Sequence, residues 1–379
     1  MKESHRYHFL FVSALYSGNA VFFENLSSAL YRRNDAEFTF LPIELSPPEF
    51  FKNVPPFSVN DSLKNAMVAR SRIRKLERNG ARFDAAFINH VTPAYFLANF
   101  MERIPTIMSL DVTPRLLDGY SGWYKTSSPS SPRHPIEYLK QKSTRNVYAR
   151  SASLMPWSDW VKRSLITDYA IDEENIQILH PGIDLEFWQC DKNRGLEEDA
   201  TQSFKILFVG GDFVRKGGDL LLEVASLPEF ERCDFHIVTR DFQGPRSNNV
   251  KVYANIDPNS DQLRALYREA DVFVIPTRAD CSSLAICEAM AMQLPVISTD
   301  VGGVGEIVEN GDTGFIVSVG SAKALAEKLR VLRDNGPLRV SMGHRGRKKA
   351  ESEYDVERTV STILFNMKRM AASNGALKL

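Results

Sequence analysis

The stretch "DVFVIPTRADCSSLAICEAMAMQLPVISTDV", residues 271–301, decides the fold of this chain. It begins with a short apolar, β-branched run, passes through a loop into an apolar helical segment, and ends in a second β-branched run. This order predicts a βαβ unit on a parallel sheet. Ligands of such sheets bind just outside the carboxyl ends of the strands. Asp280, in the loop after the first strand, and Glu288, in the helix, are therefore candidate binding residues.

The same alternation continues on both sides of this stretch. Helical segments such as "GGDLLLEVASL" and "DQLRALYREA" separate the strand-like runs, which predicts two doubly wound α/β domains. The runs in the second half are "FKILFVGG", "FHIVTRD", "NVKVYANI", "DVFVIPT", "PVISTDV" and "TGFIVS". The runs in the first half are "HFLFVSAL", "FTFLPIEL", "FDAAFINH", "PTIMSLDV", "SLMPWS" and "IQILHPG".

A polar stretch without periodicity, residues 184–203, separates the two series and is interpreted as an interdomain linker. We expect an N-terminal domain over 1–183, a C-terminal domain over 204–354 and a last helix over 355–379. That helix is amphipathic and no strand follows it, so we expect it to pack back on the N-terminal domain. Two sheets facing each other would form a cleft, with the chemistry at the strand ends.

Composition narrows the class of protein. The chain has 379 residues, 43% hydrophobic and 25% charged, as in soluble globular proteins with two domains. Lys plus Arg and Asp plus Glu both number 47, so net charge gives no argument for a nucleic-acid partner. The apolar run "HFLFVSAL" near the N-terminus is short, and we interpret it as a strand rather than a signal peptide. No run reaches the roughly 18 apolar residues of a membrane span.

The cysteines fit a reducing compartment. They form no CxxC pair and no zinc-like spacing with histidine, and four in so long a chain do not make a disulfide framework. A cytosolic location fits best, and no metal site is expected. The four are Cys190, Cys233, Cys281 and Cys287.

The loop after the first strand of the C-terminal domain has features of a phosphate cradle. In "FKILFVGGDFVRKGGDLLL" the strand is followed by Gly210 and Gly211, then by Arg215 and Lys216, then by a helix start. Backbone N–H groups at a helix N-terminus and two cations attract anions. An isolated Arg-Lys-Gly-Gly sequence is more often a solvated turn, so this pattern alone decides nothing.

Two further strand-to-helix loops have the same character. Ser282 or Ser283 can cap the helix that starts near Leu284, which leaves backbone N–H groups for a phosphate. Glu288, about one turn in, can accept hydrogen bonds from two ribose hydroxyls, while a plain helix-start acid is the alternative. After "PVISTDV", the paired glycines of "GGVGEIV" allow a close backbone approach. Three such loops together favour the binding interpretation.

The second half resembles the nucleotide-binding domain of group 1, or family 4, glycosyltransferases of GT-B fold. The resemblance implies transfer of a sugar with retention of configuration from a UDP-, GDP- or ADP-sugar to an acceptor hydroxyl. It implies no cofactor and no metal. The matching segments are "PWSDWVKRSLITDYAIDEENIQILHPGID", "FVGGDFVRKGGDLLLEVA" and "DVFVIPTRADCSSLAICEAMAMQLPVISTDVGGVGEIVENGDTGFIV".

The resemblance also implies roles for individual residues. Asp280 and Glu288 stand where the family has a Glu-x7-Glu pair, and Gly211 stands where the family often has an arginine. Lys216 keeps the diphosphate role, and Arg215 is expected to supply the missing second cation. The expected donor-binding residues are Gly18, Gly210, Gly211, Arg215, Lys216, Cys281, Ser282, Ser283, Leu284 and Glu288.

The first half matches the family only loosely, as is expected of the domain that binds the acceptor. Gly18 lies in the turn after the first strand, its usual place near the donor phosphate. Asp111, in "SLDVTP", stands where many relatives have a histidine, and it can steady positive charge at the anomeric carbon or orient the acceptor hydroxyl. For His90 and His180 a structural role is favoured. The expected catalytic residues are Asp111, Arg215, Lys216 and Asp280.

The acceptor is expected to be a sugar or a lipid-linked sugar. Arg70, Arg74 and Arg78 align on one helix face, opposite an apolar stripe, and indicate either a solvated face or contact with anionic lipid at the inner membrane face. Lys140, Lys142, Arg145 and Arg150 form a second basic stretch. A catalytically idle sugar-nucleotide-binding subunit and a GT-B sugar-nucleotide epimerase remain alternatives.

Overall fold

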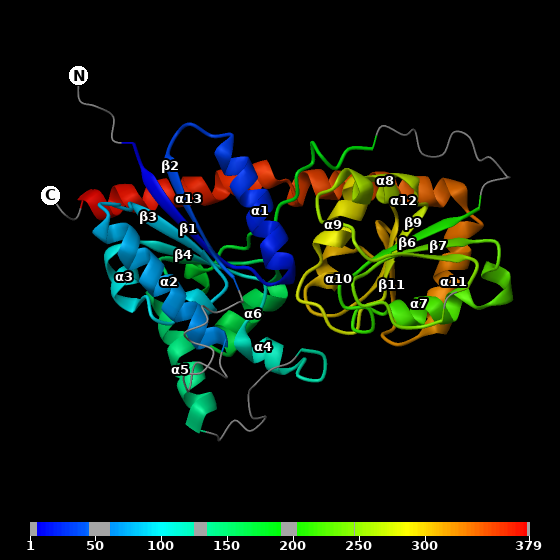
Figure 1. The fold of residues 1–379 in the computed structure, drawn as a ribbon, viewed down its shortest axis with the longest axis horizontal. Coiled ribbons are helices and arrows are strands. Elements are labelled where there is room, and N and C mark those ends of the chain that lie inside the picture. Colours follow the sequence, from blue (N-terminus) through cyan, green and yellow to red (C-terminus); the bar gives the residue numbers. More distant parts are fainter. Residues whose placement is uncertain (1–5, 45–60, 125–134, 191–202, 246, 377–379) are drawn as a thin grey trace. The chain divides into compact units, whose positions relative to one another are not determined.

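A computed structural model describes residues 6–44, 61–124, 135–190, 203–245 and 247–376 of the chain. The chain divides into two compact units. The first unit consists of Met1–Gly182 together with Val356–Leu379, and the second of Ile183–Asp355. Each unit is a parallel sheet flanked by helices (Figure 1).

The first unit contains a five-stranded sheet in the order β2-β1-β3-β4-β5, with all neighbouring strands parallel. The order reverses direction between β1 and β3, which makes their carboxyl ends the topological switch point of this sheet. The strands are β1 (His8–Ala14), β2 (Glu37–Ile43), β3 (Ala85–Asn89), β4 (Thr106–Leu110) and β5 (Ser153–Pro156).

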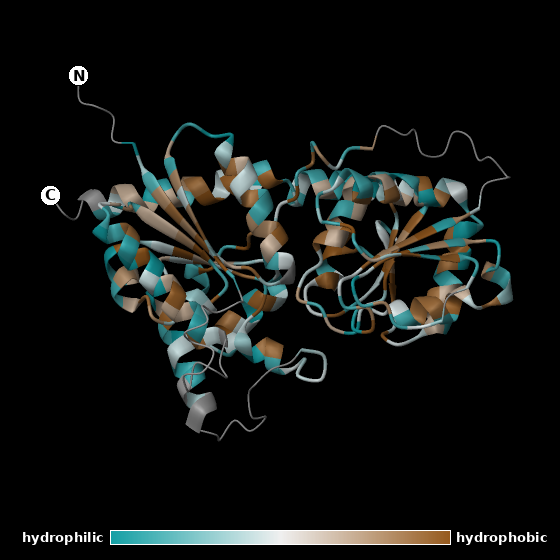
Figure 2. Ribbon diagram, viewed as in Figure 1, coloured by the Kyte–Doolittle hydropathy of each residue, from teal (hydrophilic) through white to brown (hydrophobic). Residues whose placement is uncertain are grey.

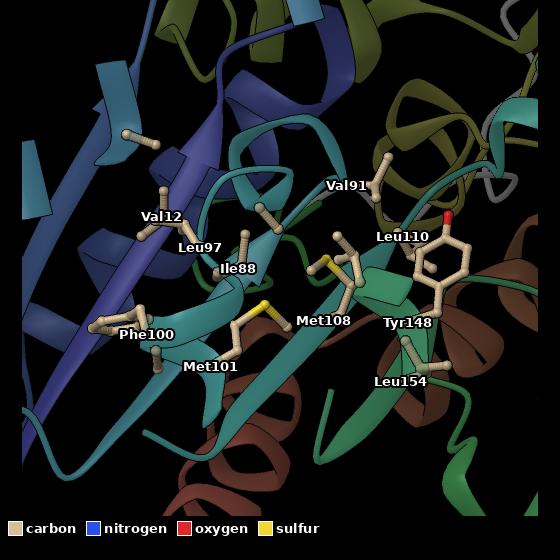
Figure 3. Close-up of a cluster of buried hydrophobic side chains, with 14 of the residues drawn as sticks. Val12, Ile88, Val91, Leu97, Phe100, Met101, Met108, Leu110, Tyr148 and Leu154 are labelled. Carbon is tan, nitrogen blue, oxygen red and sulfur yellow. The ribbon is translucent and has the colours of Figure 1, made fainter. Parts of the chain in front are cut away.

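Helices cover both faces of this sheet. Alternate strand residues such as Val12, Ile88 and Met108 belong to one buried cluster with side chains of α2, α3, α5 and α6 (Figure 3). This alternation arises because successive strand residues point to opposite faces. The helices are α1 (Ser17–Tyr31), α2 (Asp61–Arg78), η2 (Thr92–Ala94), α3 (Ala98–Arg103), α4 (Pro114–Asp118), α5 (Pro135–Arg150), α6 (Asp159–Thr167), η3 (Glu173–Asn175) and α13 (Val356–Ala376).

The last helix, α13, packs in the first unit beside α1 and β3 (Figure 1). Val360, Ile363 and Met367 are buried along one side of it, at helical spacing. Ion pairs join its solvent side to the region around the end of α1, through Arg33 with Glu357 at 2.7 Å and Lys368 with Asp35 at 2.6 Å. The expectation that the C-terminal helix packs on the N-terminal domain is confirmed.

The second unit contains a six-stranded parallel sheet in the order β8-β7-β6-β9-β10-β11. In chain order this is 3-2-1-4-5-6, the order of dinucleotide-binding folds, with the switch point between β6 and β9. The strands are β6 (Lys205–Val209), β7 (Asp234–Val238), β8 (Val250–Tyr253), β9 (Val272–Ile275), β10 (Val296–Thr299) and β11 (Gly314–Val317).

The helices of this unit shield the sheet, and hydrophobic residues gather on the strands (Figure 2). The sequence pattern did not single out α12, which packs against α9. A Cβ atom on Gly343 of α12 would lie 2.1 Å from Gln293 O, so only glycine permits this close approach. The helices are α7 (Gly218–Ala225), η4 (Pro228–Phe230), α8 (Asp261–Glu269), α9 (Leu284–Ala291), α10 (Val304–Ile307), α11 (Ala322–Arg333) and α12 (Gly336–Glu353).

Two expectations about the chain between the sheets are wrong. The run at 176–182 is not a strand, because beside β5 it forms only an isolated bridge between Ile176 and Leu154. The beginning of the expected linker, 184–190, belongs to the second unit, where Trp188 is fully buried against Tyr267. Residues 184–203 are mostly polar, so the sequence pattern did not indicate that the start of this stretch packs into a domain. The rest of the expected linker, 191–202, lies outside the described residues.

Among the described residues, no helix combines the length and the apolar composition that crossing a lipid bilayer requires.

Candidate functional site

Two loops meet at the switch point of the second unit, one after β6 and one after β9. Gly217 has φ of +83°, and a Cβ atom on it would lie 2.2 Å from Pro276 O, so the two loop backbones touch. Gly210 is enclosed by the side chains of Phe208 and Lys216, whereas a Cβ atom on Gly211 would meet no atom of the described residues within 4 Å. The space beside Gly211 is therefore open to a ligand.

Lys216 and Asp280, both expected in the site, form an ion pair between these loops. Their side chains are only 13% and 6% exposed. Two oppositely charged groups that are largely removed from water stabilise each other, and each would be costly to leave alone. The pair therefore places a cation and a carboxylate side by side at the carboxyl ends of β6 and β9.

The side chain of Arg215 makes hydrogen bonds within the protein. Its Nε donates to Asp212 Oδ2 at 2.8 Å and its Nη1 donates to the carbonyl of Ala279 at 2.7 Å. The residue is only 8% exposed. Arg215 thus ties the loop after β6 to the residue that precedes Asp280.

Arg278 makes a second link between the same loops, and the sequence analysis missed it. Its guanidinium donates to both carboxylate oxygens of Asp219, at 2.6 and 2.8 Å, and also to the carbonyl of Val214. A bidentate pair of this kind fixes geometry as well as charge. Arg278 and Asp219 are 59 positions apart, so no local pattern indicates the pairing.

Helix α9 begins at Leu284, as expected, with Ser283 at the N-cap position. The expected capping by Ser283 is wrong, because its side chain makes no cap hydrogen bond. In the described residues, the backbone hydrogen bonds of α9 begin with Ile286 N–H, which donates to Ser283 O at 3.1 Å. The N–H groups of the first turn face the start of the helix, where an anion would be stabilised. Cys281 is buried and Ser282 is half-buried beside this turn.

The paired glycines after β10 contact the loop that contains Asp280 and Cys281. Gly302 has φ of +57°, and a Cβ atom on it would lie 1.9 Å from Asp280 O. Gly303 N–H donates to Cys281 O at 3.0 Å. This third loop therefore holds the backbone at Asp280 and Cys281 in place.

Glu288 lies at the start of the second turn of α9 and is buried, at 4% exposure. Its Oε2 accepts a hydrogen bond of 3.0 Å from the hydroxyl of Tyr267. Burial raises the pKa of Glu288 to about 7, although the tyrosine hydroxyl acts in the opposite direction. Glu288 is therefore close to half-ionised near neutral pH.

The first unit has a polar network at its own switch point, around Asp111. Asn19 Nδ2 donates to Asp111 Oδ2 at 2.9 Å, and Asn89 Nδ2 donates to Asn19 Oδ1 at 2.8 Å and to Ser13 Oγ at 3.1 Å. Asn89 is fully buried, and its hydrogen bond to Asn19 Oδ1 fixes the orientation of the Asn19 amide. Gly18, next to Asn19, is exposed, and no atom in the described part of the chain lies within 4 Å of its Cβ position. The sequence analysis missed both asparagines, although their position after β1 and at the end of β3 indicates them.

His90 and His180 lie in different surroundings. His90 has φ of +73°, its ring lies 5.2 Å from that of Tyr16, and its Nδ1 lies 3.1 Å from Thr92 Oγ1. Burial lowers the pKa of His90, while the nearby charge of Asp111 opposes that shift. His180 Nδ1 lies 3.0 Å from the carbonyl of Trp157, an interaction that fits a structural role.

Within the described part of the chain, no group of three or more His, Cys, Asp or Glu side chains is arranged to hold a metal ion.

The fold of the whole chain is that of GT-B glycosyltransferases. Sucrose-phosphate synthase from Thermosynechococcus elongatus superposes with a TM-score of 0.74 at 15% identity, covering 97% of this chain and 100% of that one. Anabaena Alr3699/HepE, solved in complex with UDP and glucose, superposes with a TM-score of 0.67 at 15% identity, covering 95% and 99%. At these identities the likeness establishes the fold alone.

Residues 203–335 match the family described as glycosyl transferases group 1. The second unit therefore carries a group 1 glycosyl transferase domain. Among curated proteins, the capsular polysaccharide biosynthesis glycosyltransferase CapM of Staphylococcus aureus is 32% identical over 229 residues, which cover 52% of this chain. The match spans only 56% of CapM's own length.

Proposed function

We propose that this protein is a retaining glycosyltransferase that moves a sugar from a nucleotide diphosphate sugar to an acceptor hydroxyl. The observation that carries the proposal is the Lys216–Asp280 pair, set at the switch point of a dinucleotide-type sheet inside a group 1 glycosyl transferase domain. The complex of Alr3699/HepE with UDP and glucose supports a sugar nucleotide as donor. The name of CapM supports a role in glycan synthesis.

The donor diphosphate occupies the space beside Gly211 and the start of α9. Lys216 then contacts the diphosphate, and Asp280, released from the ion pair, accepts hydrogen bonds from hydroxyls of the donor sugar. The backbone N–H groups of Leu284 and its neighbours add partial positive charge where the leaving group develops negative charge. Arg215, held by Asp212 and Ala279, positions the loop that presents Lys216.

In the reaction, the bond between the anomeric carbon and the diphosphate oxygen breaks as the acceptor oxygen bonds to that carbon on the same face. The acceptor's proton passes to the departing phosphate oxygen, so no protein nucleophile is needed. The first unit binds the acceptor, a sugar or lipid-linked sugar, and Asp111 orients the attacking hydroxyl. The charge on the leaving group is met by Lys216 and backbone amides, and we propose that no metal is required.

Binding and turnover separate this function from its rivals. UDP-, GDP- and ADP-sugars are compared for the rise in melting temperature that they cause, because a ligand of the folded state stabilises it. Nucleotide release is then measured with and without candidate acceptor glycans. A transferase releases nucleotide only with an acceptor; an epimerase converts the sugar nucleotide without one, and a binding subunit shows affinity alone. EDTA-sensitive turnover that manganese restores would contradict metal independence.

We also propose that the first unit contacts anionic lipid on the cytoplasmic face of a membrane. Arg70, Arg74 and Arg78 are all exposed on α2, as the helical spacing predicts. Each cation near an anionic surface contributes roughly 1 kcal/mol of binding free energy. Sedimentation with phosphatidylserine vesicles should fall steeply with salt and on neutralising these arginines. Equal sedimentation of wild type and the triple glutamine variant would refute the contact.

A further inference from the structure

A buried tyrosine hydroxyl contacts the carboxyl group expected to bind the donor ribose. Tyr267, on α8, is 0% exposed, and its hydroxyl donates to Glu288 Oε2 at 3.0 Å. The same hydroxyl lies 3.2 Å from Ala285 O, within the first turn of α9. A phenol has one proton to donate, and a carboxylate oxygen is the stronger acceptor of the two.

The surrounding side chains fix where this hydroxyl lies. The ring of Tyr267 packs edge-on against Trp188 at 5.3 Å and stacks on Phe273 of β9 at 5.6 Å. Arg347 Nη1 donates to Trp188 O at 2.7 Å and to Ala291 O, at the end of α9, at 2.9 Å. Because Trp188 and α9 are tied to the same guanidinium, Tyr267 has little freedom to move relative to Glu288.

The second carboxylate oxygen of Glu288 is differently placed. Oε1 has no hydrogen-bond partner among the described residues. It is not one of the fully buried side-chain atoms without a partner, so part of its surface is accessible. A buried oxygen without any partner would be costly. Oε2 of Glu288 is therefore hydrogen-bonded on the interior side, whereas Oε1 remains accessible to a ligand.

We propose that Tyr267 is a positioning residue for donor binding, which holds Glu288 Oε2 from the interior so that Oε1 is presented to the ribose hydroxyls. This inference rests on the proposed function, because it assigns the nucleotide ribose to the site in the second unit. Tyr267 itself does not touch the donor. It acts by fixing the rotamer of Glu288 and by favouring the carboxylate form, which accepts hydrogen bonds from both sides.

The arrangement couples donor affinity to pH. An ionised Glu288 accepts from Tyr267 and from the ribose together, whereas a neutral carboxyl group loses acceptor capacity. Burial raises the pKa of Glu288 to about 7, so affinity should rise with pH through neutrality. The other titratable groups nearby are Cys287, which lies on α9, and three groups around Cys287. These three are Lys349 and Glu353, near the C-terminal end of α12, and Tyr354, which follows that helix.

The test is the pH dependence of sugar-nucleotide binding by the full chain. Dissociation constants are measured by calorimetry between pH 5.5 and 9 for whichever of UDP-glucose, GDP-mannose and ADP-glucose binds the wild type. A sugar nucleotide is used because a free nucleoside diphosphate has a terminal phosphate that itself titrates near pH 6. For Tyr267→Phe we expect the midpoint of the affinity rise to move up by about one pH unit, since one hydrogen bond to the carboxylate is lost. The dissociation constant should then increase about fivefold at pH 7, approach a tenfold increase well below pH 7, and recover to within about twofold at pH 9.

Two variants serve as controls. Tyr148 is fully buried in the first unit, and its hydroxyl has no hydrogen-bond partner among the described residues, so Tyr148→Phe should leave binding unchanged. Glu288→Gln should bind weakly and equally at every pH. A loss of affinity in Tyr267→Phe that is the same at all pH values would overturn the positioning role while leaving the proposed function intact. Failure of every sugar nucleotide to bind the wild type would instead overturn the proposed function, and the inference with it.

Discussion

Lys216 and Asp280, 64 positions apart, form a largely buried ion pair where the loops after β6 and β9 meet. Both groups belong to the expected donor site, and in the absence of the donor each charge is neutralised by the other. Lys216→Met leaves Asp280 buried without its partner, and we expect the free energy of unfolding to fall by about 3 kcal/mol. Lys216→Met combined with Asp280→Asn should recover part of that loss. Urea unfolding of the single and double variants measures the coupling, and strictly additive losses would contradict a buried pair.

Glu288 should make stability depend on pH in a defined direction. Its pKa is about 7 in the folded protein against an ordinary 4.5, so its contribution to stability is fully present below about pH 4.5 and is lost as pH rises to 7. The whole effect is about 3 kcal/mol at 1.36 kcal/mol per pKa unit. Glu288→Gln removes it. The difference in unfolding free energy between wild type and variant should therefore change between pH 5 and pH 8; a constant difference would show an ordinary pKa.

Asn19 should act on the reaction through Asp111. Asn19→Asp keeps the size of the side chain but replaces the donor facing Asp111 with a second carboxyl group. The two acids would then share a proton, so we expect turnover to lose about tenfold at pH 6 and much less at pH 8. Asn25→Asp is the matched control, since Asn25 lies on the same helix, is 5% exposed and donates to the carbonyl of Gly182. Parallel pH profiles for the two variants would remove Asn19 from the mechanism.

Gly302 should matter for the loop at Asp280 rather than for backbone strain alone. Gly302→Ala places a methyl group 1.9 Å from Asp280 O, which forces the loop to move. Gly311 has a comparable positive φ of +84°, but no atom of the described residues lies within 4 Å of its Cβ position, so Gly311→Ala isolates the backbone strain of about 1 kcal/mol. We expect Gly302→Ala to weaken sugar-nucleotide binding at least tenfold and Gly311→Ala to leave it unchanged. Equal affinities in both variants would dissociate the third loop from the site.

The alternation of strands and helices predicted both sheets, because buried parallel strands produce short apolar runs that are visible in one sequence. It also predicted the start of α9 at Leu284 and the packing of the last helix. The contacts that shape the site were not predictable in this way. Arg278 with Asp219, Tyr267 with Glu288 and Asn89 with Asn19 each join residues far apart in the chain, so their partners are decided by topology.

Helix α12 and the residues at the start of the second unit escaped prediction for a different reason. Helix α12 contains Gly343 and Gly346, which disfavour a helix in isolation, but Gly343 allows its backbone to approach Gln293, just after α9. Residues 184–203 are mostly polar and have the pattern of a linker, yet Trp188 within this stretch is fully buried. In both places tertiary packing outweighs local propensity.

The central claim is that the diphosphate of a sugar nucleotide binds at Lys216, and the most direct test is the affinity of the Lys216→Met protein. Calorimetry on wild type and variant, with folding verified by circular dichroism, compares the sugar nucleotide that stabilises the wild type best. Loss of one charged contact to the diphosphate predicts a dissociation constant raised at least thirtyfold, about 2 kcal/mol. A folded Lys216→Met protein that binds the sugar nucleotide as tightly as the wild type would contradict the claim.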